Sequence, residues 1–583
     1  MTAQERLDLG RSYFKEGRFD EAITVWSTIT RDDSPKVYAL TQLGIGAAYQ
    51  TLGKLKKAIK AWSKVRSDEN SEAYAKAQLG IGVAYHALGK LKKAIKAWSK
   101  VRHGDDPKAY AGAQFNLGIT YKNQDRLGEA ITALSSINHE DDRKTYAKAQ
   151  RNLGVVYHTL GKLDEAIDAW SKVRNDDPEA YAWAQFNLGV AYYAQEDWEQ
   201  AIAAWSNIHR EKADPETYAQ AQFGLGEIHK DKGNIKQAKD AYRNVQGPLY
   251  YRAQREYRIL GCPPELINDL RSLAKNTDKV RESLQIIPKF ESKVAHYTRP
   301  QIAFDLFEGK KNDKEPSNFR LSTIRGVNDP TEGLVLNGYW NQQGIPETIH
   351  TNNTATFISC FTFNHDSLNQ FRLYGKENGQ EATGVSLVFK KEFFSDQPDT
   401  LGFIAGPSID PSNKSGENES NEAGKPESDN KKPLIGKSTL YRCIYLDPET
   451  GYWTLAQRDK SNFYRQHKEK AKNKWKKYHK SLSKKEKSVN KHLFAKNKSV
   501  LSTLQSIFKK YQGYSTKEKQ HILETIRFIL LPLQYLVKHI AFQEEQECRI
   551  MYITQFRDEK IHSNREEQKM YVEYEEPVLP HID

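Results

Sequence analysis

A 36-residue repeat fills the N-terminal part of this 583-residue chain and constrains its fold more than any other feature. A large apolar residue returns in register with a small one, at Trp26 and Ala22 in the first unit and at Trp62 and Ala58 in the second. An aromatic residue also recurs once in each unit, at Tyr13, Tyr49, Tyr85, Tyr121, Tyr157, Tyr192 and His229. The steps between these positions are 36, 36, 36, 36, 35 and 37 residues. Self-similarity at such a period indicates a stack of like supersecondary units. We therefore predict seven stacked units over residues 1–246.

Each unit has the pattern of two amphipathic helices around a tight turn. The glycines that mark this turn are Gly17, Gly53, Gly89, Gly161 and Gly233. The pattern L-G-x-x-Y, then G-x-L/F-x-x-A, then W, resembles the tetratricopeptide repeat over residues 5–245. The resemblance implies an all-α superhelical solenoid whose concave groove binds a protein or peptide partner.

Three asparagines recur on the first helix of successive units: Asn116, Asn152 and Asn187. They are candidates to bond an extended peptide in the groove, and they fit equally a polar position beside the core. The repeat decays after Asn244, so we predict a helical cap and linker over 247–286 that covers the last apolar face.

From about Ile287 the periodicity changes. Short β-branched or aromatic runs, bounded by turn residues, predict strands at 356–363, 384–389, 440–446 and 547–554. Helical patterns lie between them at 300–309 and 516–543. We therefore predict a multidomain chain in which the solenoid precedes an α+β domain over 287–583. Residues 408–434 are polar and of low complexity, and they predict a disordered insertion.

The positive charge of the chain is concentrated in one segment. Residues 465–499 hold 14 Lys and Arg against Glu469 and Glu486, which accounts for +12 of the formal +13. Apolar residues recur there at helical spacing, so we predict one long helix within a Lys-rich insertion over 458–512. Its lysines are candidate contacts to nucleic-acid phosphates: Lys472, Lys474, Lys476, Lys477, Lys480, Lys484 and Lys485. A solvated hairpin, an oligomer contact and an anionic membrane surface are the alternatives.

Five short clusters in the α+β domain carry candidate chemistry. They are His296-Tyr297-Thr298, the run 319–333 with Asn328-Asp329-Pro330, the run 357–375 with Ser359 and Tyr374, Gly384 before a strand, and Glu544–Ile550 entering a strand. In order and composition they resemble a bacterial family, domain-of-unknown-function family 2971.

A second resemblance, to NAD-dependent ADP-ribosyltransferases, rests on an early H-x-T, a central aromatic residue and a late E-x-E. It implies NAD as the cofactor, with a carboxylate that stabilises an oxocarbenium-like sugar. By this resemblance Glu547 is the catalytic carboxylate, Glu545 activates the acceptor, and Tyr374 stacks on nicotinamide. The implied NAD-binding residues are His296, Thr298, Tyr297, Arg372 and Ser359.

The residues therefore lead to a sensor–effector hypothesis. The solenoid binds a trigger, and the C-terminal domain acts as a transferase on a nucleic acid or protein, by analogy in bacterial defence or toxicity. The alternatives are a metal-dependent nuclease using Asp329, Glu332 and Glu547, and a non-enzymatic scaffold. The longest apolar stretch, 526–542, is too short and too polar to span a bilayer, so we expect a cytoplasmic protein.

Overall fold

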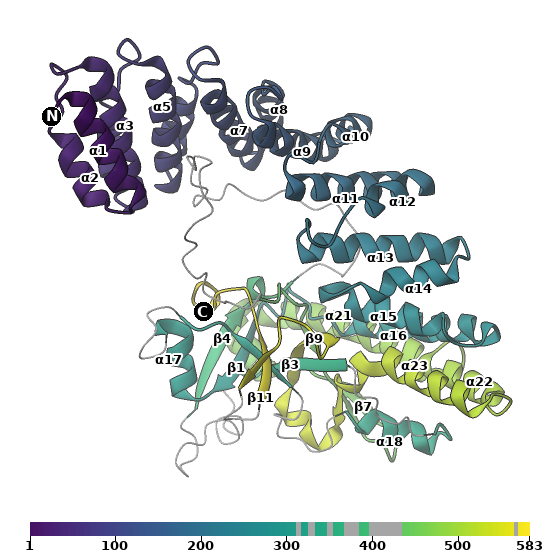
Figure 1. The fold of residues 1–583 in the computed structure, drawn as a ribbon. Helices are drawn as coiled ribbons and strands as arrows, with labels where there is room; N and C mark the ends of the chain where they lie inside the picture. The colour runs from purple at the N-terminus through teal and green to yellow at the C-terminus, as the bar shows by residue number, and fades with distance from the viewer. Residues whose placement is uncertain (310–315, 324–332, 347–353, 366–383, 396–433, 565–568) are drawn as a thin grey trace. The chain divides into compact units, whose positions relative to one another are not determined.

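The computed structural model describes the chain except residues 310–315, 324–332, 347–353, 366–383, 396–433 and 565–568 (Figure 1). The described residues form two compact units, which divide between Leu225 and Gly226. This division falls inside the seventh helical hairpin, about 20 residues before the boundary that the sequence predicts at 246.

Helical hairpins make up the N-terminal unit and continue across the division, as the repeat predicts. Their first helices are α1 (Ala3–Lys15), α3 (Pro35–Thr51), α5 (Ser71–Ala87), α7 (Pro107–Asn123), α9 (Arg143–Thr159), α11 (Pro178–Ala194) and α13 (Pro215–Asp231). Their second helices are α2 (Phe19–Ser27), α4 (Leu55–Trp62), α6 (Leu91–Trp98), α8 (Leu127–Ser135), α10 (Leu163–Ser171), α12 (Trp198–Ser206) and α14 (Ile235–Arg243).

The repeated Trp fastens the two helices of a hairpin together. In the second unit the Trp62 indole N–H donates to the carbonyl of Leu43 on the first helix, at 3.1 Å. The ring fits only because Gly46 faces it, since a Cβ there would lie 2.2 Å from Trp62 Nε1. The same bond recurs in units one, three, five and six. The fourth unit has Leu134 at this position and packs without it.

The turn between the two helices needs a left-handed residue. Gly53 has a φ of 68°, and the other turn glycines are similar. In the fourth and sixth units Asp125 and Glu196 take this conformation, each with a φ of 60°. Glycine is therefore the preferred residue at this position and not an obligatory one.

The first helices form the inner wall of the N-terminal unit. Each packs directly on the next first helix, from α1 on α3 through to α9 on α11. From α2 to α10, each second helix packs mainly on the first helices of its own and the following repeat. Elements that approach one another closely lie at the smaller radius of a curved stack, so the first helices line the concave side. Figure 1 shows α3, α5 and α7 side by side in this stack.

Helices form one layer of the C-terminal unit. They are α15 (Tyr250–Ile259), α16 (Pro264–Leu284), α18 (Val335–Gln342), α21 (Ala471–Val489), α22 (Val500–Tyr511) and α23 (Thr516–Gln534). Leu266, Leu270 and Leu273 of α16 are fully buried in one core with residues of α18, α22 and α23. Within the predicted helical cap and linker over 247–286, α15 packs on α14 as a cap would, whereas α16 is a central part of this helical core and not a linker.

A mainly antiparallel sheet forms the other layer. Its strands are β1 (Lys293–Thr298), β2 (Arg320–Thr323), β3 (Thr354–Thr362), β4 (Val385–Lys390), β5 (Tyr441–Arg442), β9 (Glu547–Gln555), β10 (His562–Asn564) and β11 (Lys569–Glu573). The order is β10-β11-β2-β3-β1-β4, while β9 pairs with β3 along its length and with β5 on its other edge. A smaller sheet joins β7 (Trp453–Leu455), β6 (Ile444–Leu446) and β8 (Val537–His539).

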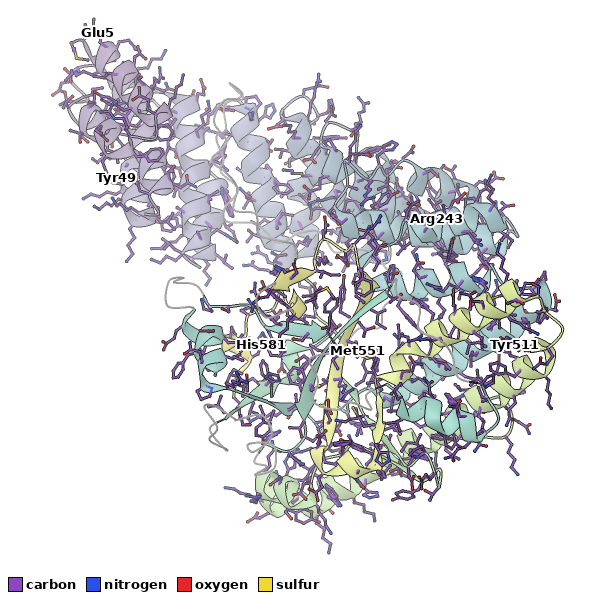
Figure 2. The ribbon with its side chains drawn as sticks, turned by 60° about the horizontal axis from the view of Figure 1, so that its bottom comes forward. Glu5, Tyr49, Arg243, Tyr511, Met551 and His581 are labelled. Atoms are coloured by element: carbon purple, nitrogen blue, oxygen red, sulfur yellow. The ribbon has the colours of Figure 1, made fainter. Side chains whose placement is uncertain are left out.

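The two faces of β9 pack on different cores. Cys548, Ile550 and Tyr552 lie in a core rich in phenylalanine. Met551, labelled in Figure 2, belongs to the opposite face and packs on the helical core. The α+β prediction is confirmed at this level, and α17 (Pro300–Glu308) lies where the sequence predicts a helix.

The Lys-rich segment is helical but is not one long helix. It contains α20 (Lys460–His467), α21 and a π-helical turn at Asn490–Phe494, followed by α22. A 3-10 turn at Lys468–Lys470 separates α20 from α21, and Lys468 there has a φ of 46°. The predicted uninterrupted helix over 465–499 is therefore wrong at both ends. Residues 408–433 of the other predicted insertion lie outside the described residues.

Candidate functional site

Glu547 lies in a buried cluster of four charged side chains. Its carboxylate accepts from Arg549 Nε at 2.6 Å and from Arg549 Nη2 at 3.1 Å. Lys538 Nζ donates to Glu547 Oε2 at 2.6 Å and also bonds to Glu545. Glu547, Lys538 and Arg549 are at most 4% exposed. We call these four residues the Glu547 cluster; its two carboxylates balance its two cations.

The electrostatics of the Glu547 cluster hold Glu547 ionised. Burial by itself raises the pKa of this carboxyl, but Arg549 and Lys538 outweigh burial and keep the pKa well below its ordinary value. Burial raises the pKa of Glu545, which has Lys538 as its main opposing charge. Burial lowers the pKa of Lys538, and the two carboxylates reverse that effect and raise it.

Local structure explains how the Glu547 cluster forms. Alternate residues of a strand point to the same face, so the E-C-R run at the start of β9 places Glu547 beside Arg549. Lys538 comes from β8, which directly follows α23. The sequence contained the Glu-x-Arg signal, but Lys538 could not be assigned to it without the tertiary structure.

His296 lies in a different environment from Glu547. Its ring packs 5.2 Å from the Phe319 ring and 5.5 Å from the Phe361 ring, measured between centroids. Its Nδ1 bonds to the carbonyl of Cys360 at 2.8 Å. A carbonyl only accepts, so Nδ1 carries the proton. Burial lowers the pKa of His296, and the Cys360 carbonyl opposes that shift.

The strand registers place His296 and Glu547 on opposite faces of the sheet. Thr362 of β3 pairs with Ala295 of β1 and with Glu547 of β9, and paired residues share a face. His296 follows Ala295 directly and therefore points to the other face, with Phe361 and Ser359. The two residues that the transferase resemblance needs in one cleft are thus separated by the sheet itself.

The remaining predicted NAD-binding residues divide between these two faces. Thr298, 7% exposed, shares the His296 face, and Ser359, 6% exposed, lies there on β3. Tyr297 shares the Glu547 face, and its hydroxyl donates to the carbonyl of Asn364 at 2.9 Å. Tyr374 and Arg372, the predicted stacking and NAD-binding residues, lie outside the described residues.

The nuclease alternative also rests partly on residues that the structure does not describe. Asp329 and Glu332 lie outside the described residues, and Glu547 is engaged with Lys538 and Arg549. In the described part of the chain, no three His, Cys, Asp or Glu side chains lie together as metal ligands would.

The Lys-rich segment is anchored in the C-terminal unit by a second buried network. Glu291 accepts from Tyr478 of α21 at 2.7 Å and from Arg442 of β5 at 2.5 Å. Arg442 is fully buried and also donates to the carbonyl of Ala456. Phe463 of α20 stacks on the Tyr478 ring at 5.6 Å. The sequence missed this network, and it makes α21 an integral part of the unit.

The seven lysines predicted to contact phosphates differ in their exposure. Lys472, Lys474, Lys476, Lys477, Lys480 and Lys484 are exposed. Lys485 instead points inward and donates to the carbonyl of Ser283, in the last turn of α16, at 3.1 Å. Burial lowers the pKa of Lys485 to about 8. Its assignment as a phosphate contact is therefore wrong, because its amine caps a helix.

The inner wall of the solenoid carries half-exposed apolar side chains and two adjoining cations. Leu43, Leu79 and Phe115 repeat at one position on α3, α5 and α7, and each is partly buried. In the next unit the same position is Arg151. Lys122 lies close to it.

These two cations bridge three first helices. Lys122 Nζ of α7 donates to Asn152 Oδ1 of α9 at 3.0 Å. The Arg151 guanidinium lies 5.3 Å from the ring centroid of Trp183 on α11. Burial lowers the pKa of Lys122, and the charge of Arg151 lowers it further. Among the described residues, no carboxylate lies within 4.0 Å of either cation. Asp177 pairs with Lys148 instead, and Asp177 and Glu179 act on Arg151 only from farther away.

Comparisons with known proteins identify the repeats. Tetratricopeptide-repeat family models match residues 7–62, 43–107, 161–217 and 219–246. No curated protein matches this sequence. No described helix combines the length and the apolar character that a membrane crossing requires.

The solved structures that resemble this chain cover between a third and a half of it. The crystal structure of MamA is 26% identical, with 33% of this chain and 97% of that chain covered and a TM-score of 0.24. A tetratricopeptide repeat protein from Parabacteroides merdae is 17% identical, with 46% and 96% covered and a TM-score of 0.28. YrrB, described as a TPR protein with an unusual peptide-binding site, is 18% identical, with 34% and 90% covered and a TM-score of 0.23. The family-model matches show that the N-terminal 250 or so residues of this chain carry tetratricopeptide repeats.

Proposed function

We propose that this chain is a scaffold whose tetratricopeptide repeats hold an extended, acidic segment of a partner protein along the inner wall. Repeats of this kind present a concave surface that suits extended protein segments. The half-exposed Leu43, Leu79 and Phe115 offer apolar contacts at a regular interval to such a segment.

The observation that carries the proposal is the pair Lys122 and Arg151. Burial lowers the pKa of both cations, and for Arg151 it outweighs the opposing charges of Glu179 and Asp177, which are not within ion-pair distance. A bound carboxylate in direct contact would offset this cost. Trp183, beside Arg151, supplies a large apolar surface next to that position. The partner segment would therefore place an Asp or Glu side chain at the junction of α7, α9 and α11.

The C-terminal unit has no catalytic role in this proposal. ADP-ribosyl transfer would require His296 and a carboxylate in one cleft, whereas Glu547 lies on the other face and is bonded to Lys538 and Arg549. Those contacts favour a structural role for Glu547 instead.

The test uses the full chain and pairs of 12-residue peptides that are identical except for a central Asp or Asn. We expect the Asp peptides to bind at least tenfold more tightly by fluorescence anisotropy. The double variant Lys122→Gln, Arg151→Gln should abolish that preference. The matched control is the double variant Lys108→Gln, Lys162→Gln, which removes two exposed lysines from the same two repeats that hold Lys122 and Arg151. Equal binding of Asp and Asn peptides, or equal loss in both double variants, would refute the proposal.

A further inference from the structure

One face of α21 is a continuous stripe of lysine. We define the lysine face as Lys472, Lys476, Lys477, Lys480, Lys484 and Lys487, all of them exposed. At 3.6 residues per turn these positions lie within an arc of about 140°, and from first to last they extend about 22 Å along the axis. The opposite side of α21 is buried through Ala471, Tyr478, Leu482 and Val489.

The charge of the lysine face is not neutralised locally. In the described part of the chain, none of its six lysines has an ion pair within 4.0 Å. Glu486, the one acidic residue of α21, is partly buried outside this arc. Like charges this close repel one another, so a multivalent anion would bind them with a favourable change in free energy.

The lysine face is also held rigidly. Tyr478, on the buried side of α21, bonds to Glu291, which in turn bonds to Arg442 of β5. Lys485 caps α16 from the same side. The backbone positions that carry the lysines therefore keep a fixed mutual geometry, which reduces the entropy that binding would otherwise cost.

The character of the face selects one class of polyanion. None of its residues is apolar, so it offers nothing to insert into a bilayer, as a membrane-surface helix would. Lysine supplies point charges without the bidentate fork that arginine uses to read bases. Six charges spread along about 22 Å of one helix face suit an elongated polyanion of regular charge spacing.

We propose that the lysine face of α21 binds the phosphate backbone of duplex nucleic acid without sequence preference. This surface belongs to the C-terminal unit and is independent of the peptide groove proposed for the solenoid. Of the lysines that the sequence suggested, Lys485 points inward and Lys474 lies outside the arc, so neither takes part, and Lys487 is added.

Salt dependence tests this inference directly. The full chain is titrated with a fluorescent 24-base-pair duplex at several salt concentrations. Six phosphate contacts predict a slope of log K against log salt of about −5, from −0.9 for each phosphate neutralised. The triple variant Lys476→Gln, Lys480→Gln, Lys484→Gln should reduce that slope by about 3 in magnitude. A second duplex of unrelated sequence should give the same affinity within twofold.

The control removes three exposed lysines from α6 and the turn that follows it: Lys92→Gln, Lys96→Gln, Lys100→Gln. It lowers the net charge equally and should leave the slope unchanged. Circular dichroism checks that both variants keep their helix content. An equal change of slope in both triple variants would show diffuse attraction only and would overturn the inference. So would no measurable duplex binding, or lysine-dependent binding to phosphatidylserine vesicles in its place.

Discussion

Replacing Glu547 by Gln separates a structural role from a catalytic one. The substitution keeps the size of the side chain and removes its charge. Lys538 is 3% exposed and Arg549 is 0% exposed, so both cations stay buried in the variant. Glu545, which bonds to Lys538, is then the one carboxylate left in the Glu547 cluster. Breaking a buried ion pair by removing one partner costs about 3 to 5 kcal/mol, because a buried charge is left uncompensated.

Hydrogen exchange measures this cost where it arises. In the full chain, backbone amides of β9 should exchange roughly a hundred to several thousand times faster in Glu547→Gln, since about 1.4 kcal/mol corresponds to a factor of ten. Glu545→Gln is the matched control. Its side chain is 13% exposed and bonds to Lys538, so about 1.5 to 3 kcal/mol is expected.

A double variant tests whether charge balance within the Glu547 cluster determines its stability. Lys538→Met together with Glu547→Gln leaves one acid, Glu545, and one base, Arg549. Because charge balance returns, the double variant should be less destabilised than the sum of its single changes. Unchanged β9 exchange in Glu547→Gln, combined with loss of a labelled-NAD transfer activity seen in the wild type, would refute the structural account and support the transferase resemblance.

Acid should weaken the same contacts. The pKa of Glu547 in the folded chain lies well below the ordinary value of 4.5, so its contribution is complete above about pH 4.5 and declines as the pH falls further. The protection of β9 should therefore decrease with acidification in the wild type. This decrease should be smaller in Glu547→Gln, which has no charge to lose at that position.

Three further predictions concern other parts of the chain. Gly82→Ala should destabilise the third repeat by about 1 to 3 kcal/mol in a urea titration, because the new Cβ would lie 2.2 Å from Nε1 of Trp98. Gly104→Ala is the control: a Cβ at Gly104 meets open space, so this variant should change the free energy of unfolding little. Tyr478→Phe should lower the protection of α21 by about 1 to 2 kcal/mol through loss of its bond to Glu291, and unchanged α21 exchange would contradict the anchoring role. Burial lowers the pKa of Lys485 from 10.5 to about 8, so between these two pH values the unfolded chain binds more protons than the folded chain. The free energy of unfolding should therefore rise from about pH 8 to about pH 9.5, and this rise should be smaller in Lys485→Met.

Sequence periodicity predicted the helical hairpins well because each depends on contacts within one repeat. Trp62 and Gly46 are 16 residues apart, and every unit repeats the same local packing. The strands at 354–362 and 547–555 were also predictable, since β-branched and aromatic runs bounded by turns identify them locally. Asp125 and Glu196 show that even a missing turn glycine does not interrupt such a strong repeat.

The candidate site could not be predicted in the same way. His296 and Glu547 are 251 positions apart, and whether they share a face depends on the parity of two strand registers. Shifting one register by a single residue would reverse the answer, because side chains alternate along a strand. By resemblance, the E-x-E run suggested that Glu547 is a catalytic carboxylate and that Glu545 activates the acceptor. In the tertiary structure both acids bond to Lys538.

In the Lys-rich segment, too, the sequence predicts local properties and the tertiary structure determines which side chains are buried. The sequence by itself determined that 465–499 is basic and helical with one apolar seam, because composition and period are local properties. Only the tertiary structure decided that the seam packs on α16, that Lys485 points inward and that the other seven lysines of α21 remain exposed. The physical reason is that burial of a side chain depends on which distant elements pack against it, and those partners are set by the whole fold.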